Sequence, residues 1–109
     1  MNPAEDDPGC SGGDSFALRV LGDSMAPEFV EGEIIIIEPD GALRDGCFVL
    51  AQQAGEWTLR QLQRAGQAWR LHALNPLYAD QALADLSAIH GVVIQKAVPG
   101  RRRLSKHYR

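Results

Sequence analysis

The chain has 109 residues, a hydrophobic fraction of 45% and a formal net charge of −3. This length fits one domain with a modest core, and no apolar run approaches the length that crosses a bilayer, so we expect no membrane association. The acidic N-terminus lacks the pattern of a signal peptide, and two cysteines are too few for a disulfide framework, so we expect a reducing, cytoplasmic setting.

The chain is predicted to be mainly β. Its first 14 residues are polar and glycine-rich, which predicts a flexible N-terminal tail. Six later segments show either alternating hydrophobicity or a β-branched apolar run, both typical of strands. These segments are 15–21, 34–37, 47–53, 56–63, 68–74 and 89–98. Only four residues, including a glycine, separate the fourth segment from the fifth, so we expect these two to form a hairpin.

The segment 79–88 leaves two structures open. It is rich in alanine and leucine, so one alternative is a short helix, and the other is extended structure with a single turn.

The last segment, 99–109, is predicted to be a basic tail. Six of the eleven lysines and arginines lie within 96–109, whereas ten of the fourteen acids lie within 1–40. Three consecutive arginines stand in the tail, at Arg101, Arg102 and Arg103. They either aid solubility or make weak, non-specific contacts with nucleic acid phosphates.

The most informative motif follows the first predicted strand and has a serine at its centre. It reads Leu21-Gly22-Asp23-Ser24-Met25-Ala26-Pro27. A serine in a turn often does no more than bond to the local backbone. It becomes a nucleophile only when a neighbouring base takes its proton, and a lysine can be that base when burial lowers its pKa.

Three sequence blocks occur in the same order as in a known protein family. They are Leu18–Pro27 with Gly32-Glu33-Ile34-Ile35, then Asp45–Ala51, then Glu56–Leu62 with Leu74–Tyr78 behind it. Together with Gly91-Val92-Val93-Ile94, they resemble the C-terminal self-cleaving serine peptidase domains of LexA, UmuD and the phage repressors. The resemblance spans residues 16–98. It implies an all-β, LexA- and signal-peptidase-like domain over 15–98, built from several small coiled sheets.

In the family that the chain resembles, the base is a lysine on a strand beside the serine. The matching position here holds Arg60, whose guanidinium stays protonated at any ordinary pH and cannot accept a proton. We therefore expect Ser24 at the nucleophile position, and Arg60 within reach of Ser24 or of an acid such as Asp23 or Glu33. The residues expected to shape this site are Gly22, Asp23, Met25, Pro27 and Glu33.

The usual cleavage bond is also missing. Resembled proteins cut an Ala-Gly or Cys-Gly bond before the domain, and residues 1–15 contain neither. The two Ala-Gly pairs, Ala54-Gly55 and Ala65-Gly66, lie in predicted turns inside the domain. We therefore expect impaired or lost self-cleavage. The alternative is an active, self-cleaving serine peptidase that uses Ser24 with an unrecognised base.

The resemblance also implies partners. It implies a homodimer that acts through protein–protein interaction in SOS or prophage regulation, with a polymerase or a repressor-type protein as partner. No helix-turn-helix domain is expected within the first 14 residues, so sequence-specific DNA binding is not expected. The three histidines show no metal-ligand spacing with cysteines or acids, so we expect no metal and no cofactor.

Overall fold

The computed structural model describes residues 14–100 and 105–108. In this part of the chain all regular structure is β, which confirms the predicted all-β class, and no helix is present that could span a membrane. The strands are β1 (Phe16–Arg19), β2 (Ile34–Glu38), β3 (Phe48–Gln53), β4 (Glu56–Ala65), β5 (Ala68–His72), β6 (Gln81–Leu83), β7 (Ile89–Ala97) and β8 (Lys106–His107). The predicted N-terminal tail, apart from its last residue, and the three consecutive arginines lie outside the described residues.

All six predicted strands are present, with ends no more than two residues from the predicted ones. The predicted hairpin is also present, since β4 pairs antiparallel with β5. Of the two alternatives left open for 79–88, the structure has the extended one. There, Gln81–Leu83 pair with β5, because strand pairing satisfies backbone groups that a short isolated helix would leave to water.

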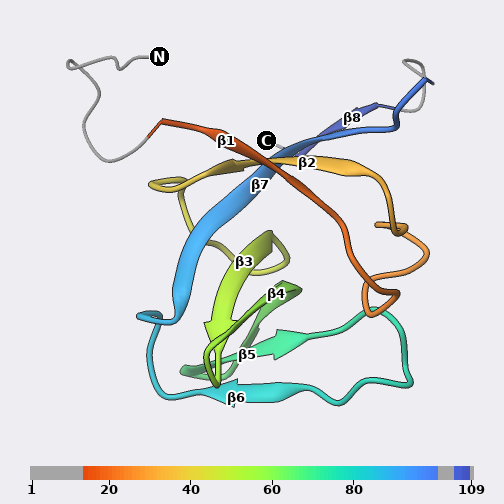
Figure 1. Cartoon of the computed structure of the whole chain (residues 1–109). Helices are drawn as coiled ribbons and strands as arrows, with labels where there is room; N and C mark the ends of the chain where they lie inside the picture. Colours follow the sequence, from red (N-terminus) through yellow and green to blue (C-terminus); the bar gives the residue numbers. More distant parts are fainter. Residues whose placement is uncertain (1–13, 101–104, 109) are drawn as a thin grey trace.

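The strands follow one hydrogen-bonded path in the order β1-β2-β7-β3-β4-β5-β6, and all pairs are antiparallel. The long strand β7 joins two groups of strands (Figure 1). Its C-terminal half pairs with β2, and its N-terminal half pairs with β3. Gly91 lies where the two pairings meet, and a Cβ there would collide with the side chain of Ile37. A glycine is therefore required at this close approach.

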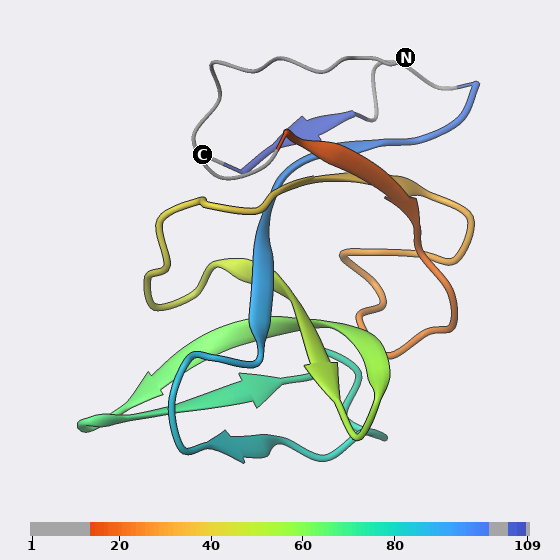
Figure 2. The ribbon, with the colours of Figure 1, turned by 60° about the vertical axis from the view of Figure 1, so that its left-hand side comes forward.

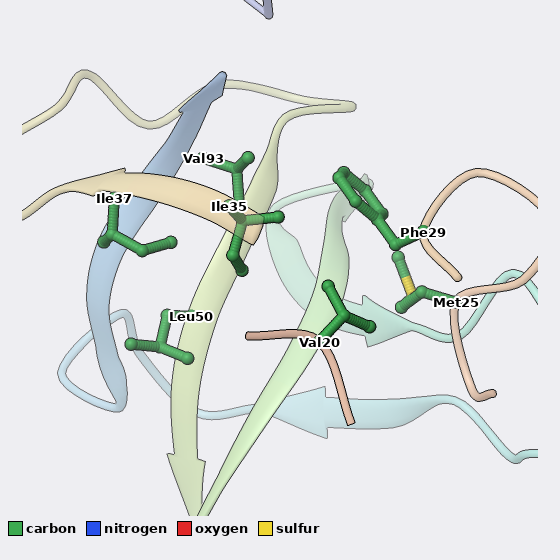
Figure 3. Close-up of a cluster of buried hydrophobic side chains, with 7 residues drawn as sticks. All are labelled: Val20, Met25, Phe29, Ile35, Ile37, Leu50 and Val93. Atoms are coloured by element: carbon green, nitrogen blue, oxygen red, sulfur yellow. The ribbon is translucent and has the colours of Figure 1, made fainter. Parts of the chain in front are cut away.

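Two clusters of buried side chains form the core. One cluster lies between β2, β7 and the loop that follows β1, and contains Val20, Met25, Phe29, Ile35, Ile37, Leu50 and Val93 (Figure 3). The other lies against β3, β4, β5 and β7, and contains Val49, Ala51, Leu62, Leu71 and Val92. In the first cluster, Met25 and Phe29 anchor the loop that carries Ser24 to the core.

Residues 105–108 pack against the domain. β8 pairs with β7, and Figure 2 shows it lying alongside that strand at one end of the molecule. The next residue, Tyr108, stacks against Phe29 and Phe48, with ring centroids 5.4 and 5.5 Å apart. Its hydroxyl donates to a Glu28 carboxylate oxygen at 2.6 Å, and the same oxygen lies 2.8 Å from the Lys106 ammonium. The C-terminal segment thus braces the loop after β1.

This brace predicts that stability depends on pH through Glu28. Burial raises the pKa of Glu28, but the hydrogen bonds from Lys106 and Tyr108 and the nearby ammonium charges outweigh it and lower the pKa below 4.5. A lowered folded-state pKa means that the ionised form stabilises the fold above about pH 4.5 and that this contribution disappears as the pH falls through the lowered value. Glu28→Gln should therefore cost about 1 kcal/mol or less at pH 7, since solvent screens a partly exposed group.

The measurement is urea unfolding followed by circular dichroism between pH 7 and pH 3. The difference between Glu28→Gln and the natural chain should shrink as the pH falls. Glu31→Gln, an exposed acid in the same loop, is the matched control and should show no such trend. A Glu28→Gln difference of constant size over this range would contradict the prediction.

Candidate functional site

The loop between β1 and β2 carries Ser24 and is closed at its base by the backbone. The Val20 amide donates to the Glu33 carbonyl at 2.8 Å, and the Gly32 amide donates to the Val20 carbonyl at 2.9 Å. Gly22 adopts a φ of 78°, a left-handed conformation that glycine reaches without steric cost. The chain therefore turns sharply just before the serine.

Ser24 and Arg60 meet across this loop. Arg60 lies on β4, and its Nη1 donates to the Ser24 Oγ at 2.8 Å. The same nitrogen donates to the Leu59 carbonyl at 2.8 Å, which fixes the guanidinium against its own strand. Burial lowers the pKa of Arg60, an effect that nearby Tyr78 opposes, yet a guanidinium remains cationic at ordinary pH. The expected proximity of the two side chains is present, and the group that touches the hydroxyl is a hydrogen-bond donor.

A groove of about 560 Å³ opens at this pair. Its walls are β1, the start of the serine loop and the first half of β4. Most of its lining is apolar and includes Phe16, Leu18, Leu21, Trp57, Leu59 and Tyr78. All four residues of β1 are exposed, and Phe16 and Leu18 line the groove. Only Val20, just after the strand, is buried. Such a groove suits an extended chain with apolar side chains.

Two residues outside the predicted set position the serine loop. The Asn75 backbone amide donates to the Ser24 carbonyl at 3.0 Å, and its side-chain amide donates to the Asp23 carbonyl at 3.1 Å. The Tyr78 hydroxyl donates to the Asp23 carboxylate at 2.7 Å. Both residues belong to the block Leu74–Tyr78, which is part of the family resemblance. That resemblance was the one sequence signal that this block lies near the serine. Figure 1 shows the loop after β1 reaching the segment after β5.

The other members of the predicted set lie around the serine in different ways. Met25 is buried beneath it, and Pro27 is exposed and follows a cis peptide bond. The Asp23 carboxylate bonds to Tyr78 and not to Arg60. The Glu33 carboxylate accepts from the Val30 amide at 2.8 Å and lies 3.5 Å from the Lys96 ammonium. Glu33 therefore stabilises the far end of the loop instead of pairing with Arg60.

The groups that might replace a missing lysine are engaged elsewhere. The Lys96 ammonium donates to the Glu28 carbonyl at 2.6 Å. His72 Nδ1 lies 2.6 Å from an Asp80 carboxylate oxygen, and its cross-strand partner is Gln61. Since side chains alternate along a strand, His72 projects from the face of the sheet opposite Arg60. The hydrogen bond to Asp23 raises the pKa of Tyr78, so this phenol stays protonated near neutral pH.

Among residues 14–100 and 105–108, no group of three or more metal-ligating side chains occurs. The site itself consists of a serine hydroxyl that lines an apolar groove, beside a cation on a neighbouring strand. An all-β domain with a serine in a turn after its first strand, facing the side chain of a neighbouring strand, is the arrangement that the resemblance to the self-cleaving serine peptidase domains implies.

Comparison with known proteins gives the family. The Peptidase S24-like family profile matches residues 5–94. The chain belongs to this family. It is similar to LexA repressor 2 of Pseudomonas putida, with 40% identity over 59% of this chain and 32% of that protein. It is also similar to the LexA repressor of Syntrophobacter fumaroxidans, with 34% identity over 84% of this chain and 45% of that protein.

A third relative is the prophage repressor CohE of Escherichia coli. It is 31% identical over 83% of this chain and 42% of that protein. The chain thus spans less than half the length of these relatives.

Proposed function

We propose that this chain is a LexA- and UmuD-like protein of the serine peptidase scaffold in which self-cleavage is impaired or lost, and which acts by binding other proteins. The observation that carries the proposal is the 2.8 Å hydrogen bond from Arg60 to the Ser24 hydroxyl. A base would accept the proton of that hydroxyl. A guanidinium instead donates to the oxygen and holds its lone pair, which lowers its nucleophilicity.

The proposal includes a setting and partners. The chain would act in the bacterial cytoplasm, in SOS or prophage regulation, as a homodimer that contacts a polymerase or a repressor-type protein. The relatives named LexA repressor and prophage repressor support this setting. Weak contact of Arg101, Arg102 and Arg103 with nucleic acid remains part of the proposal, and these residues lie outside the described part of the chain.

The test is prolonged incubation of the purified full chain at pH 7 to 9.5, followed by mass spectrometry. We expect no self-shortening over several days, because general-base help worth about 10²–10⁴-fold in rate is absent. The matched control is Ser24→Ala, which should likewise show a single, unchanged intact mass over the same period. Shortening that occurs in the natural chain and disappears in Ser24→Ala would establish the rival function, an active peptidase with another base.

The upper pH limit of this test has a structural reason. Burial and the hydrogen bond to Glu28 raise the pKa of Tyr108 far above its usual 10. A raised folded-state pKa means that the neutral phenol stabilises the fold below about pH 10 and that this contribution is lost as the pH rises further. Incubation below pH 10 therefore keeps the loop braced.

A further inference from the structure

Arg60 has an unused hydrogen-bonding edge. A guanidinium carries five N–H groups. The two on Nη1 donate to the Ser24 hydroxyl and the Leu59 carbonyl. The remaining three, on Nε and Nη2, donate to no residue in the described part of the chain. These two nitrogens form the side-on fork that binds a carboxylate through two parallel hydrogen bonds.

The charge of Arg60 also lacks a counter-charge among the described residues. Burial is the main influence on its pKa, and the only charged or polar group that shifts it is Tyr78. Asp23 lines the same groove, but its carboxylate accepts from the Tyr78 hydroxyl. The guanidinium lies over the Tyr78 ring, 5.9 Å from its centroid, but no described carboxylate neutralises its charge, and an incoming anion would do so. Arg19 adds a second cation to the groove wall.

The serine loop has further donors, on the Nη1 side of the guanidinium. The Ser24 oxygen accepts from Arg60, so its hydroxyl hydrogen is available to an acceptor. The backbone amides of Ser24 and Met25 make no hydrogen bond with another described residue. Because the Nε–Nη2 fork faces away from Nη1, a carboxylate would bind the fork alone, beyond the reach of the hydroxyl hydrogen.

The rest of the groove suits an extended peptide. β1 pairs only with β2, and β5 pairs with β4 only from Gln61 onward. The first half of β4 and the outer side of β1 are therefore strand edges that no described strand covers, and both line the groove. Exposed strand edges bind extended peptides through main-chain hydrogen bonds, and alternate side chains fill apolar pockets.

We propose that the groove binds the C-terminal end of an extended apolar peptide, with its free α-carboxylate held by the Nε–Nη2 fork of Arg60. This inference rests on the proposed function, since it names the class of partner that the non-cleaving site receives. A peptidase groove with a neutral base binds an internal carbonyl beside the serine. A permanent cation at the base position favours a carboxylate there instead.

The test compares two peptides on the full chain by isothermal titration calorimetry at pH 7.5. Both have the sequence acetyl-Ser-Thr-Val-Ile-Val-Ala, and one ends in a free carboxylate whereas the other ends in a carboxamide. We expect the carboxylate peptide to bind about tenfold more tightly or better, the ratio that one charge-assisted hydrogen-bonded pair contributes. In Arg60→Gln the two affinities should agree within about twofold.

Arg64→Gln is the matched control. Arg64 lies on the same strand, is exposed, and stacks on Trp69 with its guanidinium 5.3 Å from the ring centroid, outside the groove. The tenfold preference should survive in this variant. Circular dichroism of both variants checks that each is folded.

Three results would overturn the inference and leave the proposed function intact. Equal binding of the two peptides would assign the groove to internal segments. A preference that persists in Arg60→Gln would place the carboxylate on another group. Binding of neither peptide at millimolar concentration would remove the groove as a peptide site. Self-shortening that depends on Ser24 would instead contradict the proposed function, whatever the ratio of the affinities for the two peptides.

Discussion

Arg60→Lys is expected to raise the rate at which the protein cleaves a supplied Ala-Gly peptide by about 10²–10⁴-fold over the natural chain. The reason is the position of Arg60, whose Nη1 touches the Ser24 hydroxyl at 2.8 Å. A lysine there would approach the same oxygen. The burial that lowers the pKa of Arg60 would also lower that of a lysine, since no described carboxylate shifts this pKa to favour the charged form. A neutral amine could then accept the hydroxyl proton.

The measurement is peptide cleavage followed by mass spectrometry between pH 6 and pH 9.5. The rate should rise with pH as the new amine loses its proton and should then level off. Arg64→Lys, on the exposed part of the same strand, should stay as inert as the natural chain. The double variant Ser24→Ala/Arg60→Lys should lose the gained activity.

Continued inertness of Arg60→Lys at every pH would contradict the view that only the base is missing. It would mean that other parts of the site, such as the donors around Ser24, no longer fit a scissile carbonyl. The same variant tests the further inference by a second route, because a lysine presents a single charge without a fork. Its preference for the carboxylate peptide should fall below that of the natural chain.

Much of the site could be predicted from the sequence because its parts are local or tied to a motif. Ser24 lies in a contiguous block, and Arg60 lies on a strand whose pairing partner was also visible as a strand. Their contact follows once β4 crosses beneath the serine loop. Of the alternatives expected for Arg60, contact with Ser24 occurs and pairing with an acid does not, because Asp23 bonds to Tyr78 and Glu33 lies beside Lys96. Such choices depend on side chains 55 and 63 residues apart in the chain.

The parts of the fold that escaped prediction depend on long-range packing. β8 has only two residues and no hydrophobic alternation, and it exists because β7 offers an open edge. Tyr108 sits in a basic segment, yet it packs against two phenylalanines. The alternating hydrophobicity of the sequence predicts the apolar face of β1. It does not tell whether that face packs against the core or lines a groove. Only the placement of β4 opposite β1 decides that.

Phe29→Ala is expected to lower the free energy of unfolding by about 3–5 kcal/mol, the largest stability loss among these variants. Phe29 is 0% exposed and lies in the serine loop, not in a strand. Its ring packs edge-on against Phe48 with centroids 4.9 Å apart and also contacts Tyr108. The Lys96 ammonium lies over the same ring, 5.6 Å from its centroid. Removing the ring would leave a cavity between the loop, β3 and Tyr108, because the close-packed core collapses only in part.

The measurement is urea and thermal unfolding at pH 7, where the midpoint temperature should fall by more than about 12 °C. Leu77→Ala is the matched control, because Leu77 is 87% exposed and its loss should change stability by no more than about 0.5 kcal/mol. Phe29→Leu fills part of the cavity, so its free energy of unfolding should fall clearly less than that of Phe29→Ala. This variant still gives a measurable value if the alanine variant does not fold. A Phe29→Ala loss below about 1 kcal/mol would mean that the brace between β8 and the serine loop does not depend on this ring. Because Phe29 belongs to the same core cluster as Met25, which lines the groove, Phe29→Leu should also weaken binding of the carboxylate peptide, whereas Leu77→Ala should not.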